Sequence, residues 1–188
     1  MVDLFVKGGP FMWPLLGMLF FGLVVSFERL YTLSKAHVNS KEFFTRVQEA
    51  LKQGGPEAAA EICSNTPGPV ASVLHAGLLR LDRGLDHVEK AITESGAIEM
   101  AFLEKGMVWL STVANIAPLL GFLGTVSGMI GAFEAIAAAG DVEPSIVASG
   151  ISEALITTAS GLIIAIPIQA FHNFFVSKID KIIIDMQE

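Results

Sequence analysis

The sequence predicts an all-α integral membrane protein with three transmembrane helices, an outer N-terminus, an inner C-terminus and a helical cytoplasmic loop. Of the 188 residues, 52% are hydrophobic and only 16% are charged, whereas soluble domains carry about 25% charged residues. Three stretches are also apolar and long enough to cross about 30 Å of hydrocarbon, which takes roughly 20 residues of helix. The net charge of −7 argues against a nucleic-acid partner, because nucleic-acid-binding domains are basic.

The first predicted span covers residues 10–33 and follows an outer tail, residues 1–9. Lys7 precedes the apolar run, an arrangement that also occurs in signal peptides. However, no small-residue cleavage pattern follows Phe27, so we expect a helix that is retained. Trp13, near the start of this span, is typical of a membrane interface.

Residues 34–105 are predicted to form a cytoplasmic helical segment, broken at Gly54-Gly55-Pro56 and at Pro67-Gly68-Pro69. The segment has no glycine-rich phosphate loop, metal-ligand cluster or nucleophile–base pair, so we expect no enzyme activity, cofactor or metal. Cys63 has no intrachain partner and is interpreted as an inert, structural thiol. One charged helix face fits either solvent or a partner protein, and both interpretations stay open: Asp82, Arg83, Asp86, Glu89 and Lys90.

The second predicted span, residues 106–138, carries a stripe of small residues at spacings of four, three, four, three and four: Ala117, Gly121, Gly124, Gly128, Gly131 and Ala135. In a bilayer, small residues let helix backbones approach closely and so gain van der Waals contact. Packing within the chain explains part of this small-residue stripe. A stripe of this length also fits packing between copies of the chain, so we expect a homo-oligomer.

The third predicted span, residues 145–177, follows a short outer loop, residues 139–144, and precedes an inner tail, residues 178–188. The orientation follows from the positive-inside rule. Lys7 is the only basic residue on the side assigned as outer, and the other helix ends carry the basic residues Arg29, Lys35, Lys41, Arg46, Lys90, Lys105, Lys178 and Lys181.

Glu153 is the candidate functional residue, because it is a carboxylate inside the apolar third span. A charged side chain at the centre of a membrane helix costs about 2.5–3.5 kcal/mol on the translocon scale, so an intramembrane acid indicates function. Ser149, Thr157 and Ser160 share its helix face. Serine and threonine hydroxyls can also bond to carbonyls of their own helix, and for Ser149 and Ser160 that alternative stays open.

The second and third spans each contain a motif of small and polar residues. The first motif runs from Pro118 to Ile130 and contains Gly-Phe-Leu-Gly-Thr-Val-Ser-Gly. The second runs from Ile151 to Leu162, contains Ser-Glu-Ala-Leu-Ile-Thr-Thr-Ala-Ser-Gly, and is followed by Ala165-Ile166-Pro167. Together with the order of the three spans and the large loop, these two motifs resemble the ExbB/TolQ/MotA family of proton-channel stator subunits.

The resemblance implies a multi-pass subunit of the cell inner membrane that forms a pentamer around a dimer of a single-span partner. That partner, similar to ExbD, TolR or MotB, would supply a membrane Asp as the main ion carrier. By position, Glu153, Thr125 and Thr158 match residues that face the partner and the ion path, and Pro118 and Pro167 match prolines associated with conformational change. Thr157 is retained beside Thr158 because it shares the helix face of Glu153.

Within the family, three spans and one long inner loop favour an ExbB-like role, in which the proton-motive force energises outer-membrane transport through TonB. A TolQ-like role in envelope integrity, with a TolA-like partner, is the alternative. A non-conducting membrane scaffold, in which Glu153 makes only a structural hydrogen bond, is a further alternative. The sequence does not decide between H⁺ and Na⁺.

Overall fold

The computed structural model describes residues 2–36, 40–140 and 144–187, which are helical apart from short connections and contain no strand. This result confirms the predicted all-α class. Three helical stretches are long and apolar enough to cross a membrane by length and composition, within Met12–Ser34, Leu85–Ala139 and Pro144–Gln187. Their membrane boundaries and orientation stay predictions.

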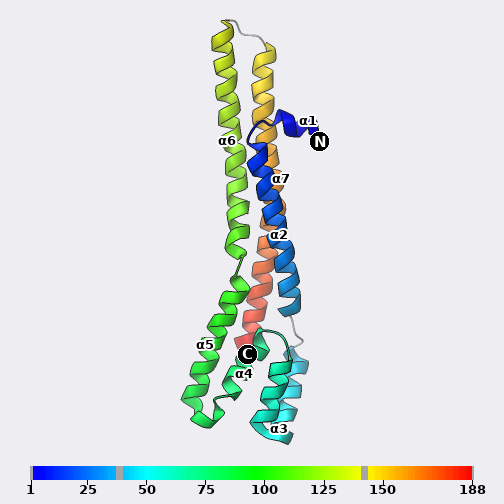
Figure 1. The fold of residues 1–188 in the computed structure, drawn as a ribbon, viewed down its shortest axis with the longest axis vertical. Coiled ribbons are helices and arrows are strands. Elements are labelled where there is room, and N and C mark those ends of the chain that lie inside the picture. The colour runs from blue at the N-terminus through cyan, green and yellow to red at the C-terminus, as the bar shows by residue number, and fades with distance from the viewer. Residues whose placement is uncertain (1, 37–39, 141–143, 188) are drawn as a thin grey trace. The chain divides into compact units, whose positions relative to one another are not determined.

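The helices α1 to α7 follow one another along the chain as Figure 1 labels them, and the short helix η1 lies between α4 and α5. They are α1 (Val2–Lys7), α2 (Met12–Ala36), α3 (Ser40–Asn65), α4 (Pro69–Leu78), the 3₁₀ helix η1 (Leu81–Arg83), α5 (Leu85–Glu104), α6 (Met107–Ala139) and α7 (Pro144–Gln187). The chain divides into two compact units. The first, called the hairpin unit here, comprises Met1–Phe27 and Met107–Asn173, and the second, the loop unit, comprises Glu28–Gly106 and Phe174–Glu188.

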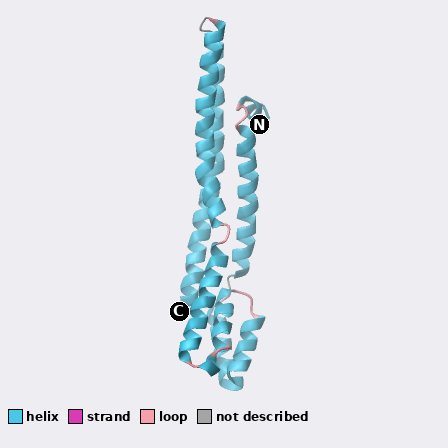
Figure 2. Ribbon diagram, turned by 60° about the vertical axis from the view of Figure 1, so that its left-hand side comes forward, coloured by secondary structure: helices cyan, strands magenta, loops and turns pink. Residues whose placement is uncertain are grey.

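In the hairpin unit, α6 and the first part of α7 lie side by side and antiparallel (Figure 1, Figure 2). Helix α2 contacts both, because a Cβ added at Gly22 would lie 2.8 Å from Ile168 Cδ1 on α7 and 3.3 Å from Val113 Cγ1 on α6. Large apolar side chains also cover the outside of the unit, including Leu119, Phe122, Phe133, Ile163 and Ile166. Monomers in water rarely expose such patches, and lipid would cover them in a bilayer.

Both sequence-predicted prolines lie inside long helices. Helix α6 continues through Pro118 and α7 continues through Pro167 without a break in the helix assignment. Proline removes one backbone hydrogen bond from a helix interior, so each position is a place where the helix can bend. The predicted role of these prolines in conformational change stays a prediction.

The loop unit has its own apolar core, formed by Phe43, Val47, Ala59, Cys63, Val70 and Ala71. Both predicted breakers act as expected. Gly55 has φ +74° and interrupts α3 just before Pro56, while Gly68 has φ +132° and precedes Pro69 at the start of α4. Burial raises the pKa of the Cys63 thiol, which agrees with an inert, structural cysteine.

Arg29 is a buried cation of the loop unit, with a side chain that is 5% exposed. Its Nε lies 2.6 Å from Glu28 Oε2, and its Nη1 donates to the backbone carbonyl of Leu103 at 3.5 Å. That carbonyl belongs to the last turn of α5, where unpaired carbonyls and the helix dipole favour a positive charge. Arg29 thereby joins α2 to the end of α5.

Two segments differ from the simple layout expected from the sequence, and a third lies partly outside the described residues. The predicted outer tail, residues 1–9, contains the helix α1. Helix α7 continues to Gln187 through most of the predicted inner tail, so its 44 residues extend about 66 Å, twice the thickness of the hydrocarbon. Part of the predicted outer loop, residues 141–143, lies outside the described residues.

Candidate functional site

Glu153 lies on α7, half-buried, against the turn that joins α1 to α2. Gly9 in that turn has φ +69°, and a Cβ at this position would overlap Oε1 of the Glu153 carboxylate. Only glycine adopts this conformation readily, and only glycine leaves room for the acid. The neighbouring Gly8 packs on Ile156 in the same way, since a Cβ added at Gly8 would lie 3.1 Å from Ile156 Cγ2.

The other side of Glu153 borders a hollow between α6 and α7, called the outer hollow here because it lies toward the predicted outer loop. Its volume is about 490 Å³. Its lining includes Ser127, Gly131 and Ala135 of α6 and Ser149, Gly150 and Glu153 of α7. Within the part of the chain that the structure describes, the Glu153 carboxylate has no cationic partner.

Thr157 and Thr158 occupy different environments, as their positions on the helix predict. Thr157 is fully buried, and its hydroxyl donates to the backbone carbonyl of Glu153 at 2.6 Å. It fills the space that Gly124 leaves on α6, since a Cβ there would lie 2.7 Å from Thr157 Cβ. Thr158 donates to the backbone carbonyl of Gly121 at 3.2 Å and so connects the two helices.

Thr125 is half-buried on α6, and its hydroxyl donates to the carbonyl of Phe122 at 2.6 Å. The three predicted threonine hydroxyls therefore all donate to backbone carbonyls of this chain. Each oxygen keeps lone pairs that can still accept a hydrogen bond. The structure brings Thr157 and Thr158 next to the glycines of α6, but no described contact joins Thr125 to the Glu153 carboxylate.

The small-residue stripe divides into two parts. Four of its members are buried and face α7 of the same chain: Ala117, Gly121, Gly124 and Gly128. A Cβ at Gly128 would lie 3.1 Å from the backbone oxygen of Gly150. The other two members, Gly131 and Ala135, are exposed and line the outer hollow. The inner part of the stripe is thus occupied by packing within the chain and gives no support to the expected homo-oligomer, which stays a prediction.

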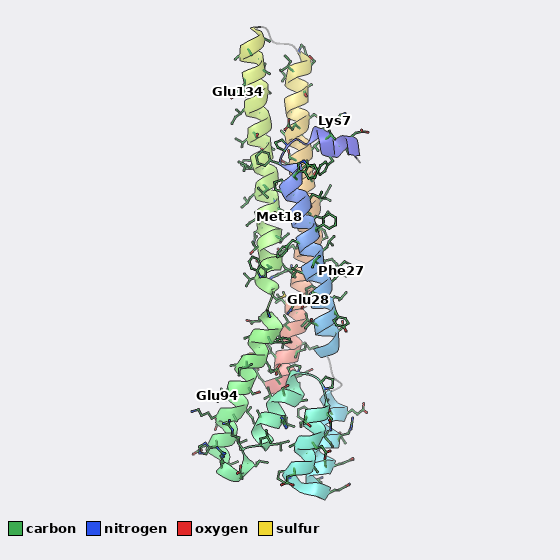
Figure 3. The ribbon with its side chains drawn as sticks, viewed as in Figure 1. Lys7, Met18, Phe27, Glu28, Glu94 and Glu134 are labelled. Carbon is green, nitrogen blue, oxygen red and sulfur yellow. The ribbon has the colours of Figure 1, made fainter. Side chains whose placement is uncertain are left out.

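Several polar positions escaped the sequence reasoning. The sequence did not predict the contact between Gly9 and Glu153, because the two residues are distant along the chain. A second hollow of about 520 Å³ on the hairpin unit is lined by polar residues that include Ser111, Asn115 and His172. A search for polar residues within the apolar spans would have found these three. The same search would have found Glu134, an exposed acid on α6 (Figure 3).

The geometry limits what the site can do. The Glu153 side chain borders the outer hollow on one side, and the Gly9 turn covers its other side. Among the described residues, no group of three or more His, Cys, Asp or Glu side chains could hold a metal ion. Among the described residues the site offers one acid without a second acid beside it, so a proton relay through these residues needs water or another polypeptide.

Comparisons with known proteins agree with the resemblance of the two motifs. A family model described as the MotA/TolQ/ExbB proton channel family matches residues 65–188. A putative biopolymer transport protein ExbB homolog of Methanothermobacter thermautotrophicus is 28% identical over 180 residues, which are 95% of this chain and 64% of that protein. The biopolymer transport protein exbB1 of Vibrio cholerae is 30% identical over 167 residues, which are 85% of this chain and 72% of that protein.

A shorter match extends over the most similar part of the chain. The Tol-Pal system protein TolQ of Haemophilus influenzae is 40% identical over 84 residues, which are 45% of this chain and 37% of that protein. The chain therefore spans between 37% and 72% of the length of these three relatives.

Proposed function

The chain belongs to the MotA/TolQ/ExbB proton channel family, and we propose that it is the channel-forming subunit of an ion-driven motor in the cell inner membrane. The motor would use the proton-motive force to energise outer-membrane transport, as an ExbB-like protein. It would assemble as a homo-oligomer, a pentamer by family resemblance, with a single-span protein that carries a membrane Asp. A TonB-like protein would receive the work.

The observation that carries the proposal is the Glu153 carboxylate, half-buried in an apolar helix and without a cation beside it in the described structure. A membrane helix that keeps such a group bears a cost of a few kcal/mol. The hydroxyls of Thr157 and Thr158 lie on the next turn of α7. A proton on Glu153 would move to the Asp of the partner, through water or directly, when the two carboxyls approach.

The driving force is sufficient for mechanical work. One elementary charge that crosses the membrane potential releases about 2.3 kcal/mol per 100 mV, so a few protons per step supply several kcal/mol. H⁺ is favoured over Na⁺ because Na⁺ needs several oxygen ligands, whereas a single carboxyl can carry a proton.

The decisive experiment replaces Glu153 by Gln and compares it with Glu134→Gln as a matched control. Both changes remove one carboxylate from the hairpin unit, but Glu134 is exposed on α6 and Glu153 is half-buried on α7. The protein is reconstituted in vesicles with an ExbD-like single-span protein that carries a membrane Asp, and proton uptake is followed with a trapped pH dye. We expect Glu153→Gln to assemble normally and to lose partner-dependent uptake, and Glu134→Gln to keep it.

Normal uptake by Glu153→Gln would remove this acid from the mechanism and would favour the scaffold alternative. Imposing a sodium gradient without a proton gradient separates the two ions, since uptake driven by sodium alone would overturn the proton assignment. The same vesicles therefore test the residue and the ion independently.

A TolQ-like role is the second candidate, because the identity to a TolQ protein, 40% over 84 residues, is nearly as high as the identity to an ExbB protein, 41% over 99 residues. The two roles differ in the partner. Co-purification of the chain with a TonB-like protein supports the ExbB-like role, and co-purification with a TolA-like protein supports the TolQ-like role.

A further inference from the structure

The loop unit contains a pocket that the proposed motor function does not use. It has a volume of about 270 Å³ and is called the loop pocket here. The inner end of α2, the start of α4 and the last turns of α5 form its wall. The lining includes Tyr31, Thr32, Gly68, Ser72, Glu99 and Phe102. The pocket therefore combines two aromatic rings, one carboxylate and two hydroxyls.

The loop pocket lies at the level where the membrane is predicted to end on the inner side. Arg29 on α2 donates to the backbone carbonyl of Leu103 on α5, so these two residues are level with each other. Tyr31 follows Arg29 by two residues along α2, and Glu99 precedes Leu103 by four along α5. At about 1.5 Å per residue of helix, both side chains start about 3–6 Å further inward. The first predicted span ends at residue 33, so the pocket is beside the lipid headgroups of the inner leaflet.

The chemistry of the loop pocket suits an ammonium group. Glu99 is half-buried, and among the described residues no ion pair joins its carboxylate to a cation. Tyr31 and Phe102 are 64% and 52% exposed, and aromatic rings attract cations through their negative faces. A primary ammonium has three N–H donors. The Glu99 carboxylate and the hydroxyls of Thr32 and Ser72 offer three acceptors.

We propose that the loop pocket binds the primary ammonium of an aminophospholipid of the inner leaflet, such as the ethanolamine headgroup. The order of charges favours a lipid over a lysine side chain of a partner protein. Lys105 has an exposed side chain and lies on the membrane side of Glu99, just before the second predicted span. In a zwitterionic headgroup the phosphate is nearer to the acyl chains than the ammonium is, so the phosphate would face Lys105 while the ammonium faces Glu99. The inference uses the predicted membrane boundary and does not rest on the motor function.

Native mass spectrometry of the full chain in detergent tests the pocket. Phosphatidylethanolamine and phosphatidylglycerol with the same acyl chains are added in turn, because only the first carries an amine. We expect the parent to bind phosphatidylethanolamine about two- to fivefold more tightly, as for a partly exposed ion pair. Glu99→Gln should lose this preference, because the amide keeps the size of the side chain but not its charge. Glu94→Gln removes an exposed acid of the same helix outside the pocket and should keep the preference (Figure 3).

No preference for phosphatidylethanolamine in the parent, or an equal preference in Glu99→Gln and Glu94→Gln, would overturn the proposal. Neither result would bear on proton uptake, which is measured with the Glu153 variant.

Carbodiimide coupling identifies which amine occupies the pocket. The reagent activates a carboxylate, which then forms an amide with an adjacent primary amine while the carbodiimide leaves as a urea. In nanodiscs that contain phosphatidylethanolamine, we expect a lipid amide on Glu99 and not on Glu94, and none in nanodiscs of phosphatidylcholine, which has no primary amine. Coupling of Glu99 to a lysine of an ExbD-like protein in the same nanodiscs, without a lipid adduct, would assign the pocket to a partner protein and overturn the lipid proposal.

Changes at Tyr31 test the aromatic contribution. Tyr31→Phe keeps the ring, whereas Tyr31→Leu keeps an apolar side chain without it. We expect Tyr31→Phe to keep the preference for phosphatidylethanolamine and Tyr31→Leu to lower it about twofold, the size of an exposed cation–π contact. Equal preferences in the two variants would remove the ring from the proposed site.

Discussion

Replacing Gly161 by Ala tests the packing of α6 against α7, on which the site geometry depends. A Cβ at Gly161 would lie 2.6 Å from the backbone oxygen of Ala117 and 3.2 Å from Gly121 Cα. Both neighbours are backbone atoms, so no side chain can move aside and the two helices must separate. The Thr158–Gly121 hydrogen bond, one turn away on α7, would lengthen at the same time.

The expected magnitude follows from terms that act in opposite directions. Overpacking a well-packed site costs about 1–3 kcal/mol, and the strained hydrogen bond adds up to about 0.5–1.5 kcal/mol. In the opposite direction, replacing Gly by Ala inside a helix stabilises the helix by about 0.5–1 kcal/mol. We therefore expect Gly161→Ala to be less stable than the parent by roughly 0.5–4 kcal/mol, the range that these three terms give together.

The matched control is Gly131→Ala, which has the same propensity gain but an open site. It should be stabilised by about 0.5–1 kcal/mol, so the difference between the two variants isolates the packing term. Unfolding in mixed detergent micelles, followed by the fluorescence of Trp13 and Trp109, measures the stability of both variants, because each indole packs edge-to-face against a phenylalanine of the hairpin unit. A difference between the variants below about 0.5 kcal/mol, as for ordinary surface changes, would refute close packing of α6 and α7.

Two further predictions concern the covered acid and the buried thiol. Gly9→Ala should displace the turn or the Glu153 carboxylate, so partner-dependent proton uptake should fall. The control Gly17→Ala lies at a position with open space on α2 and should keep the uptake of the parent. Equal uptake by the two variants would contradict the contact between Gly9 and Glu153. Burial raises the pKa of the Cys63 thiol, because the folded protein favours the neutral form. The buried neutral thiol therefore contributes fully to stability below about pH 8.5, the ordinary thiol pKa. This contribution is lost as the pH rises through the pKa of the folded state. The stability of the protein should therefore decline above that pH in the parent and less in Cys63→Ala, and identical pH profiles of denaturant unfolding would count against the burial of the thiol.

Local physical chemistry explains what the sequence determined by itself. Helix in the apolar stretches follows from their length and composition, because a segment in a bilayer must satisfy its own backbone hydrogen bonds. The breaks at Gly55 and Gly68 also needed no tertiary information, since positive φ and a following proline act over a few residues. The different environments of Thr157 and Thr158 were likewise readable from helix geometry.

Only the tertiary structure decided what each surface meets. A stripe of small residues predicts close helix packing but does not identify the helix that packs against it. In the structure, Gly124 and Gly128 face α7 of the same chain. The contact of Gly9 with Glu153 joins positions far apart in sequence, for which periodicity carries no signal. The same holds for the outer hollow, because Ser127 and Ser149 belong to different helices and come together only when α6 and α7 pack in one register.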